Sequence, residues 1–184
     1  MDGSRRARSV ILPLGVLVAL AASVTACSDG GGDDGLTAQQ RTVADNLTAE
    51  ILRSGTVTGQ DSVTAEQASC IARGTVRDVG VDRLRHYRIV TADLKVDKTV
   101  QGVRMDHTDA VALAKVFVRC IDTEGMFEDQ FLQAPSAKKL TSAQRRCIRA
   151  AIDERAVVQA LTLSFQGHDK RVYASLQGRL ARCA

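Results

Sequence analysis

The chain has 184 residues, a formal net charge of +4, 45% hydrophobic residues and only 3% aromatic residues. This length suits one domain of ordinary size behind an export signal, and two small halves that share a core are the alternative. So few aromatic residues leave Val, Leu, Ile and Ala to build the core, and they exclude a surface rich in stacking platforms for nucleic-acid bases.

The first residues have the order of an export signal. Three arginines, Arg5, Arg6 and Arg8, come first. An apolar run from Val10 to Ala22 follows, and then the tetrad Val24-Thr25-Ala26-Cys27. A cationic start, an apolar segment and small residues before a cleavage point are typical of a signal peptide. A membrane-spanning helix is an alternative, because about 18 apolar residues can just cross a bilayer, and ordinary secretion is another. Pro13 and Gly15 interrupt the run, which favours a cleaved signal over residues 1–26.

The tetrad that ends at Cys27 resembles the lipobox of bacterial lipoproteins. In that family the cysteine thiol is diacylated, the signal is cut just before it, and the cysteine becomes the first mature residue. The resemblance implies a lipid anchor on Cys27 at the extracytoplasmic face of the cell membrane. Two or three fatty acyl chains such as palmitate would hold it stably, since each buried methylene is worth about 0.8 kcal/mol.

Residues 28–35 read Ser-Asp-Gly-Gly-Gly-Asp-Asp-Gly and offer nothing to bury. This composition predicts a flexible tether. The expected organisation is therefore a signal peptide over residues 1–26, a lipidated cysteine and tether over 27–35, and an extracytoplasmic domain over 36–184.

The spacing Thr-x-x-Gln occurs three times and marks helix starts. It begins at Thr37, Thr64 and Thr141. A threonine at the N-cap and a glutamine three residues later satisfy each other's backbone amides at the start of a helix. Together with the apolar spacing that follows, these starts predict helices over about residues 38–53, 65–78 and 142–152.

Apolar spacing predicts the remaining elements and an all-α class. We expect a short turn over 83–89 after Asp82, a helix from Ala110 to Cys120, a short helix from Met126 to Leu132 before Pro135, a helix capped by Asp153 that runs to Phe165 and stops at Gly167, and a helix from Val172 to Cys183. The stretch from Ile89 to Val103 fits a strand, a hairpin or a helix start, and we interpret it as a loop.

Four cysteines remain besides Cys27, at positions Cys70, Cys120, Cys147 and Cys183. An even number in an exported protein predicts two disulfides. A zinc site is the competing interpretation, but these spacings contain no CxxC or HxxxH pair. Spacing alone does not choose among the three pairings that four cysteines allow.

An internal repeat favours one pairing. Thr64–Ile71 and Thr141–Ile148 share the pattern T-x-x-Q-x-x-C-I, and each is followed by a helical segment that closes with Arg-Cys. A disulfide from Cys70 to Cys120 and another from Cys147 to Cys183 would each link the beginning and the end of one of two related units. We call residues 63–123 the first repeat unit and residues 140–184 the second repeat unit.

A further resemblance rests on the T-x-x-Q-x-x-C element and on the segment from Asp109 to Cys120. This arrangement looks like that of small helical lipoproteins from high-GC Gram-positive bacteria. The resemblance implies an extracytoplasmic helical domain with cysteine pairs, and it implies no activity.

Positive charge is concentrated at the C-terminus. Residues 138–184 carry ten basic and three acidic side chains, whereas residues 36–137 carry 12 basic and 14 acidic ones. Solvated helix faces would explain this, but Arg145, Arg146 and Arg149 are also candidate contacts for an anionic surface such as lipid head groups or wall polymers. Nucleic acid is not an expected partner, because the predicted location is outside the cytoplasm. In addition, only Phe165 and Tyr173 offer stacking platforms for bases in the basic segment.

No residue set has the pattern of a catalytic or metal site, so we expect no cofactor and no metal. His107 lies in Asp106-His107-Thr108-Asp109, where helix capping by Asp106 or Thr108 competes with a metal cluster. His86 lies among arginines, and His168 lies in a predicted turn.

The sequence favours a binding or accessory module of the cell envelope, acting on an envelope protein or an anionic polymer. A hydrolase that uses His107, Asp109 or His168 and a carrier of a small apolar ligand are the alternatives. The oligomeric state stays open.

Overall fold

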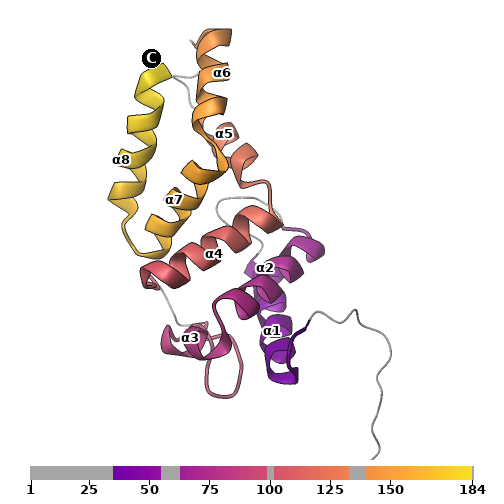
Figure 1. Ribbon diagram of the computed structural model, residues 1–184. Helices are drawn as coiled ribbons and strands as arrows, with labels where there is room; N and C mark the ends of the chain where they lie inside the picture. Colours follow the sequence, from indigo (N-terminus) through magenta and orange to yellow (C-terminus); the bar gives the residue numbers. More distant parts are fainter. Residues whose placement is uncertain (1–34, 55–62, 99–101, 133–139, 184) are drawn as a thin grey trace, which may run out of the picture. The chain divides into compact units, whose positions relative to one another are not determined.

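A computed structural model describes residues 35–54, 63–98, 102–132 and 140–183 (Figure 1). The predicted signal peptide, Cys27, most of the tether, Pro135 and the two lysines at 138 and 139 lie outside these ranges. The described residues form helices joined by short connections, which confirms the all-α class.

The elements follow one another without a sheet in the described ranges. They are α1 (Ala38–Ser54), α2 (Ala65–Asp78), α3 (Val81–His86), α4 (His107–Cys120), α5 (Thr123–Leu132), α6 (Ser142–Ala151), α7 (Glu154–Phe165), α8 (Asp169–Leu180) and the 3-10 helix η2 (Ala181–Cys183).

The three predicted capping boxes are present. Thr64 Oγ1 accepts the Gln67 amide at 3.2 Å, while Gln67 Oε1 accepts the Thr64 amide at 3.0 Å. The same reciprocal bonds join Thr141 with Gln144 and Thr37 with Gln40. The repeated spacing therefore marks the starts of α1, α2 and α6.

Three helices begin about one turn earlier than apolar spacing predicts. α4 begins at His107 rather than Ala110, where capping by Asp106 places it. α5 begins at Thr123 rather than Met126, because Asp122 Oδ1 accepts the Gly125 amide at 2.9 Å and caps the helix early. α8 begins at Asp169 rather than Val172 and ends at Leu180. The last three residues of the predicted helix, Ala181–Cys183, form the tighter helix η2. Polar starts of this kind carry no apolar periodicity.

The segment between α2 and α4 departs from the prediction at its beginning. The helix α3 forms over Val81–His86, earlier than the expected turn over 83–89, because Val81 and Leu84 point into the core one turn apart. Beyond α3, residues 89–98 form the predicted loop, with a single antiparallel bridge between Val90 and Val96.

The first core lies between α1, α2, α3 and one side of α4. Its fully enclosed side chains include Val43 of α1, Val76 of α2 and Leu84 of α3. The helices α2 and α4 run antiparallel and approach closely, since Cys70 is bonded to Cys120 and Gly74 faces Val116.

α4 joins the two repeat units. Ala110 and Leu113 face the first core, whereas Ala114, one residue further on, faces a second core with Val157 and Leu161 of α7. Phe117 packs against both cores, and its ring lies 5.4 Å from that of Phe165. The second core also receives Ile148 of α6 and is closed by α8 and η2.

Both predicted disulfides are present. Cys70 is bonded to Cys120, and Cys147 is bonded to Cys183, each with a Cα–Cα distance of 5.6 Å. The pairing inferred from the repeat is thus confirmed. Among the described helices, none is both long and apolar enough to cross a bilayer.

Candidate functional site

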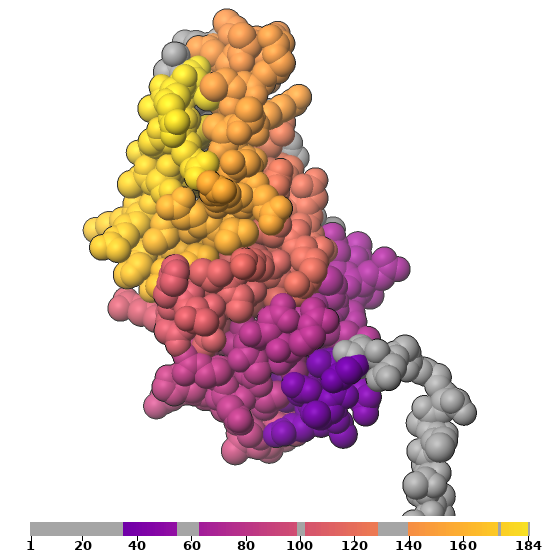
Figure 2. Space-filling model, in the orientation of Figure 1, coloured from indigo at the N-terminus to yellow at the C-terminus, as the bar shows by residue number. Residues whose placement is uncertain are grey.

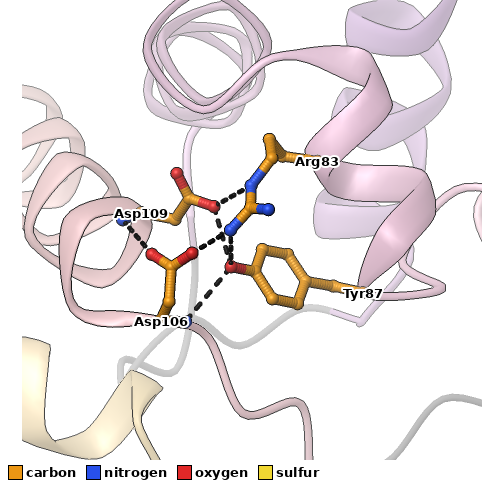
Figure 3. Close-up of polar contacts among 4 residues, drawn as sticks. All are labelled: Arg83, Tyr87, Asp106 and Asp109. Atoms are coloured by element: carbon orange, nitrogen blue, oxygen red, sulfur yellow. Dashed lines mark hydrogen bonds and ion pairs between the residues drawn. The ribbon is translucent and has the colours of Figure 1, made fainter.

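The densest polar cluster joins α3 to the start of α4 (Figure 3). It contains Arg83 and Tyr87 from the first of these segments and Asp106 and Asp109 from the second. Sequence reasoning named the two aspartates as parts of a helix start and did not find Arg83 or Tyr87. The two pairs lie about twenty residues apart, and no local pattern connects them.

Tyr87 is at the centre of this cluster. Its hydroxyl donates to Asp109 Oδ2 at 2.7 Å and accepts from Arg83 Nη2 at 2.7 Å and from the Asp106 amide at 3.1 Å. Since one hydroxyl has one donor and two acceptor positions, all three are used.

Two carboxylates share the guanidinium of Arg83. Its Nε donates to Asp109 Oδ2 at 2.6 Å, and its Nη2 forms an ion pair with Asp106. The other oxygen of Asp106 accepts the Asp109 amide at 3.0 Å and so caps α4. Capping by Asp106, one of the two sequence interpretations, is therefore what the structure contains.

The cluster shifts the pKa values of two members. The hydrogen bonds from Arg83 to Asp109 and to Tyr87 raise the pKa of the guanidinium above its ordinary value. Burial, followed by the hydrogen bond to Asp109, raises the pKa of Tyr87. Both shifts keep the groups in the protonation state they already hold at neutral pH. The cluster therefore acts as a clamp between α3 and α4.

The three histidines occupy separate positions at helix ends. His107 is the exposed first residue of α4, and His168 is the exposed N-cap of α8 without a side-chain capping bond. His86 ends α3 and meets the edge of the Tyr87 ring. In the described ranges, no three His, Cys, Asp or Glu side chains gather closely enough to hold a metal ion.

The three predicted basic contacts on α6 differ in their surroundings. Arg149 Nε pairs with Glu128 of α5 at 2.5 Å, and Arg145 is half-buried with its Nε 3.5 Å from the Leu140 carbonyl. Arg146 is exposed and forms no ion pair with the side chains that the structure describes.

A groove of about 260 Å³ lies between α6 and the end of α8. Its walls and floor are formed by Cys147, Ala150, Ala151, Arg179, Arg182 and Cys183. Figure 2 shows the orange atoms of α6 beside the yellow atoms of α8 and η2 in this part of the molecule. Sequence reasoning counted Arg179 and Arg182 in the basic segment but did not place them at a groove.

A second, larger groove of about 460 Å³ lies where the start of α1 meets α3. Gln40 of α1 and the oppositely charged Asp82 and Arg83 contribute to its walls. Arg83 is already bound within the clamp, and Asp82 Oδ1 lies 3.4 Å from Arg85 Nη1, so both charges at this groove have a partner of opposite sign.

No protein-family model matches the chain, and comparison with curated proteins and with solved structures gave no significant match.

Proposed function

We propose that this protein is a lipid-anchored, extracytoplasmic binding or accessory module of the cell envelope. The observation that carries the proposal is the pair of disulfides behind a lipobox-like tetrad at Cys27. Disulfides form and persist in oxidising compartments, so they agree with export.

The choice of a binding module rests on the polar groups. The side chains of the clamp, Arg83, Tyr87, Asp106 and Asp109, hydrogen-bond to one another and link α3 to α4, as a structural support does. The second repeat unit, in contrast, presents basic side chains outward, with eight basic and three acidic residues over 140–183. Such a surface attracts anionic partners.

Cell fractionation of a Cys27→Ala variant tests the location. We expect the wild-type protein in the membrane fraction and resistant to high-salt washing, because acyl chains rather than charge hold it. The variant should lose its acyl chains and be recovered outside the washed membrane. A Ser28→Ala variant, which keeps the cysteine, serves as the matched control. Equal retention of the Cys27→Ala variant with its signal removed would contradict the anchor.

Crosslinking on intact cells tests the role as a module. The anchored protein should enrich a specific envelope component that the Cys27→Ala variant does not enrich at the same expression level. Recovery of the protein alone from both strains would contradict an accessory role.

A further inference from the structure

The groove between α6 and α8 combines positive charge with a floor of small side chains. Arg179 and Arg182 lie one turn apart at the end of α8 and in η2, and both line the groove. Opposite them, α6 contributes Ala150 and Ala151, which leave room between the helices. From this arrangement we propose that the groove binds a phosphodiester group of an anionic envelope polymer, an inference that rests on the proposed extracytoplasmic location.

The charges around the groove favour an anion. Within the described residues, Arg182 is exposed and forms no ion pair, and the same holds for Arg146, which lies one turn before Ala150 on α6. Arg179 has one acidic neighbour, since its Nη1 lies 3.4 Å from Asp153 Oδ1. Two guanidinium groups therefore have no counterion among the described residues, and that of Arg179 has a 3.4 Å contact with Asp153.

The hydrogen-bonding character of the walls narrows the ligand class. Among the lining side chains only the two arginines form strong hydrogen bonds, and a guanidinium donates but does not accept. A phosphodiester linkage presents acceptor oxygens and a permanent negative charge, and arginine binds it in a bidentate manner. Neutral polysaccharides carry no negative charge for these guanidinium groups to bind, and the comparison with polyglutamate separates a phosphodiester from a carboxylate ligand.

The groove lies in a different part of the sequence from the predicted lipid anchor at Cys27. The chain enters the domain at α1, which packs on α2, whereas the groove is formed by α6, α8 and η2. Between these elements, α4 packs on α2 and on α7, and α7 packs on α8. The groove thus belongs to the second repeat unit, whereas α1, where the described chain begins, packs on the first repeat unit.

The second disulfide holds the groove together. Cys147 of α6 is bonded to Cys183 of η2, and both cysteines line the groove. Reduction of this bond would free η2, and with it Arg182, from α6. Binding is therefore expected to require the oxidised protein.

The test measures binding of a fluorescent poly(glycerol phosphate) oligomer to the full lipidated chain in neutral detergent, by fluorescence anisotropy. Changing Arg179→Gln together with Arg182→Gln should weaken binding about tenfold, the factor typical for loss of charge-assisted contacts. A matched pair, Arg155→Gln with Arg171→Gln, removes the same charge from exposed sites outside the groove. It should weaken binding by less than about twofold at 0.15 M salt, where exposed charges are screened.

Two further variants keep the test decisive if loss of Arg179 disturbs folding. Arg182→Gln alone leaves the contact between Arg179 and Asp153 intact and should still weaken binding. Asp153→Asn retains a good N-cap for α7 but removes the competing charge, so it should strengthen binding. The Asp153 carboxylate caps α7 by accepting the Ala156 amide at 2.7 Å, which an asparagine oxygen can also do.

Equal weakening by the groove pair and the matched pair would overturn the proposal, because it would show attraction by overall charge. Binding of polyglutamate as tight as that of the phosphate polymer, or groove-dependent binding to phosphatidylglycerol vesicles without polymer binding, would overturn the assignment of the ligand. These measurements use purified protein, so failure of the groove is distinguishable from failure of the anchor, which cell fractionation reports.

Discussion

The two repeat units begin with the same capping box and close with equivalent disulfides, but they bury very different amounts of side chain. The first helix of the first unit, α2, buries six residues, whereas its counterpart α6 buries Ile148 alone. α2 is enclosed by α1 and α4, and among the described helices none covers α6 in the same way. Equal local signals can therefore begin helices whose stability has different sources, which are packing in the first unit and the covalent bond in the second.

The largest expected effects come from removing each disulfide. The chain-entropy relation gives about 4 kcal/mol for either bond, because the enclosed loops are of similar length. The cysteine separations are 50 and 36 residues. We expect Cys70→Ala with Cys120→Ala to lower the midpoint of urea unfolding while α2 stays protected from hydrogen exchange.

Cys147→Ala with Cys183→Ala should instead expose the amides of α6 and α8 to rapid exchange under native conditions. Hydrogen exchange detected by mass spectrometry separates the two cases. Similar loss of protection in α2 and α6, whichever bond is removed, would remove the distinction between the units.

Replacing either of two helical glycines by alanine should change the free energy of unfolding in opposite directions. A Cβ at Gly74 would lie 2.7 Å from Cγ1 of Val116, which is fully buried, so Gly74→Ala should destabilise the protein by about 1–3 kcal/mol through overpacking. A Cβ at Gly178 of α8 would meet nothing within 4 Å. Gly178→Ala should therefore stabilise the helix by about 0.5–1 kcal/mol. Urea unfolding measures both, and a neutral Gly74→Ala would show that α2 and α4 are not closely packed.

The capping boxes sharpen the comparison with smaller effects. Thr64→Ala and Thr141→Ala each remove an N-cap oxygen, which costs about 1 kcal/mol. We expect Thr64→Ala to reduce global stability, because α2 is part of the first core. Thr141→Ala should mainly increase hydrogen exchange at the start of α6. If both changes reduced global stability equally, α6 would be as firmly integrated as α2.

The smallest expected effect is a raised pKa of Tyr87, which a titration at high pH measures. Because burial and Asp109 raise the pKa of Tyr87 above its ordinary value, the folded state prefers the neutral phenol. This contribution to stability is complete below the unfolded pKa and is lost as pH rises through the folded one. In a Tyr173→Phe variant, absorbance near 295 nm reports Tyr87 alone. Its midpoint should exceed that of the urea-unfolded chain, and equal midpoints would contradict the clamp.

The sequence predicted those features that depend on residues close together in the chain. Capping boxes and apolar spacing located most helices, and the repeat identified both disulfides. The missed starts of α5 and α8 depend on polar residues that follow a turn, such as Asp122, whose capping role becomes evident only when the helix is present.

Features that depend on distant residues were not predicted. The clamp brings Arg83 to Asp109, and the groove is lined by both Ala150 and Arg182. No sequence pattern indicates which residues at such separations come together. Arg149 illustrates the same point, because its partner Glu128 lies on another helix and uses a charge that was expected to face a ligand.

The lipid anchor is the claim on which the envelope role depends, and the intact mass of protein purified from membranes tests it most directly. The account predicts a chain that begins at Cys27 and carries the added mass of a diacylglycerol group on that residue. An unmodified Cys27, or a chain that retains residues 1–26, would contradict it.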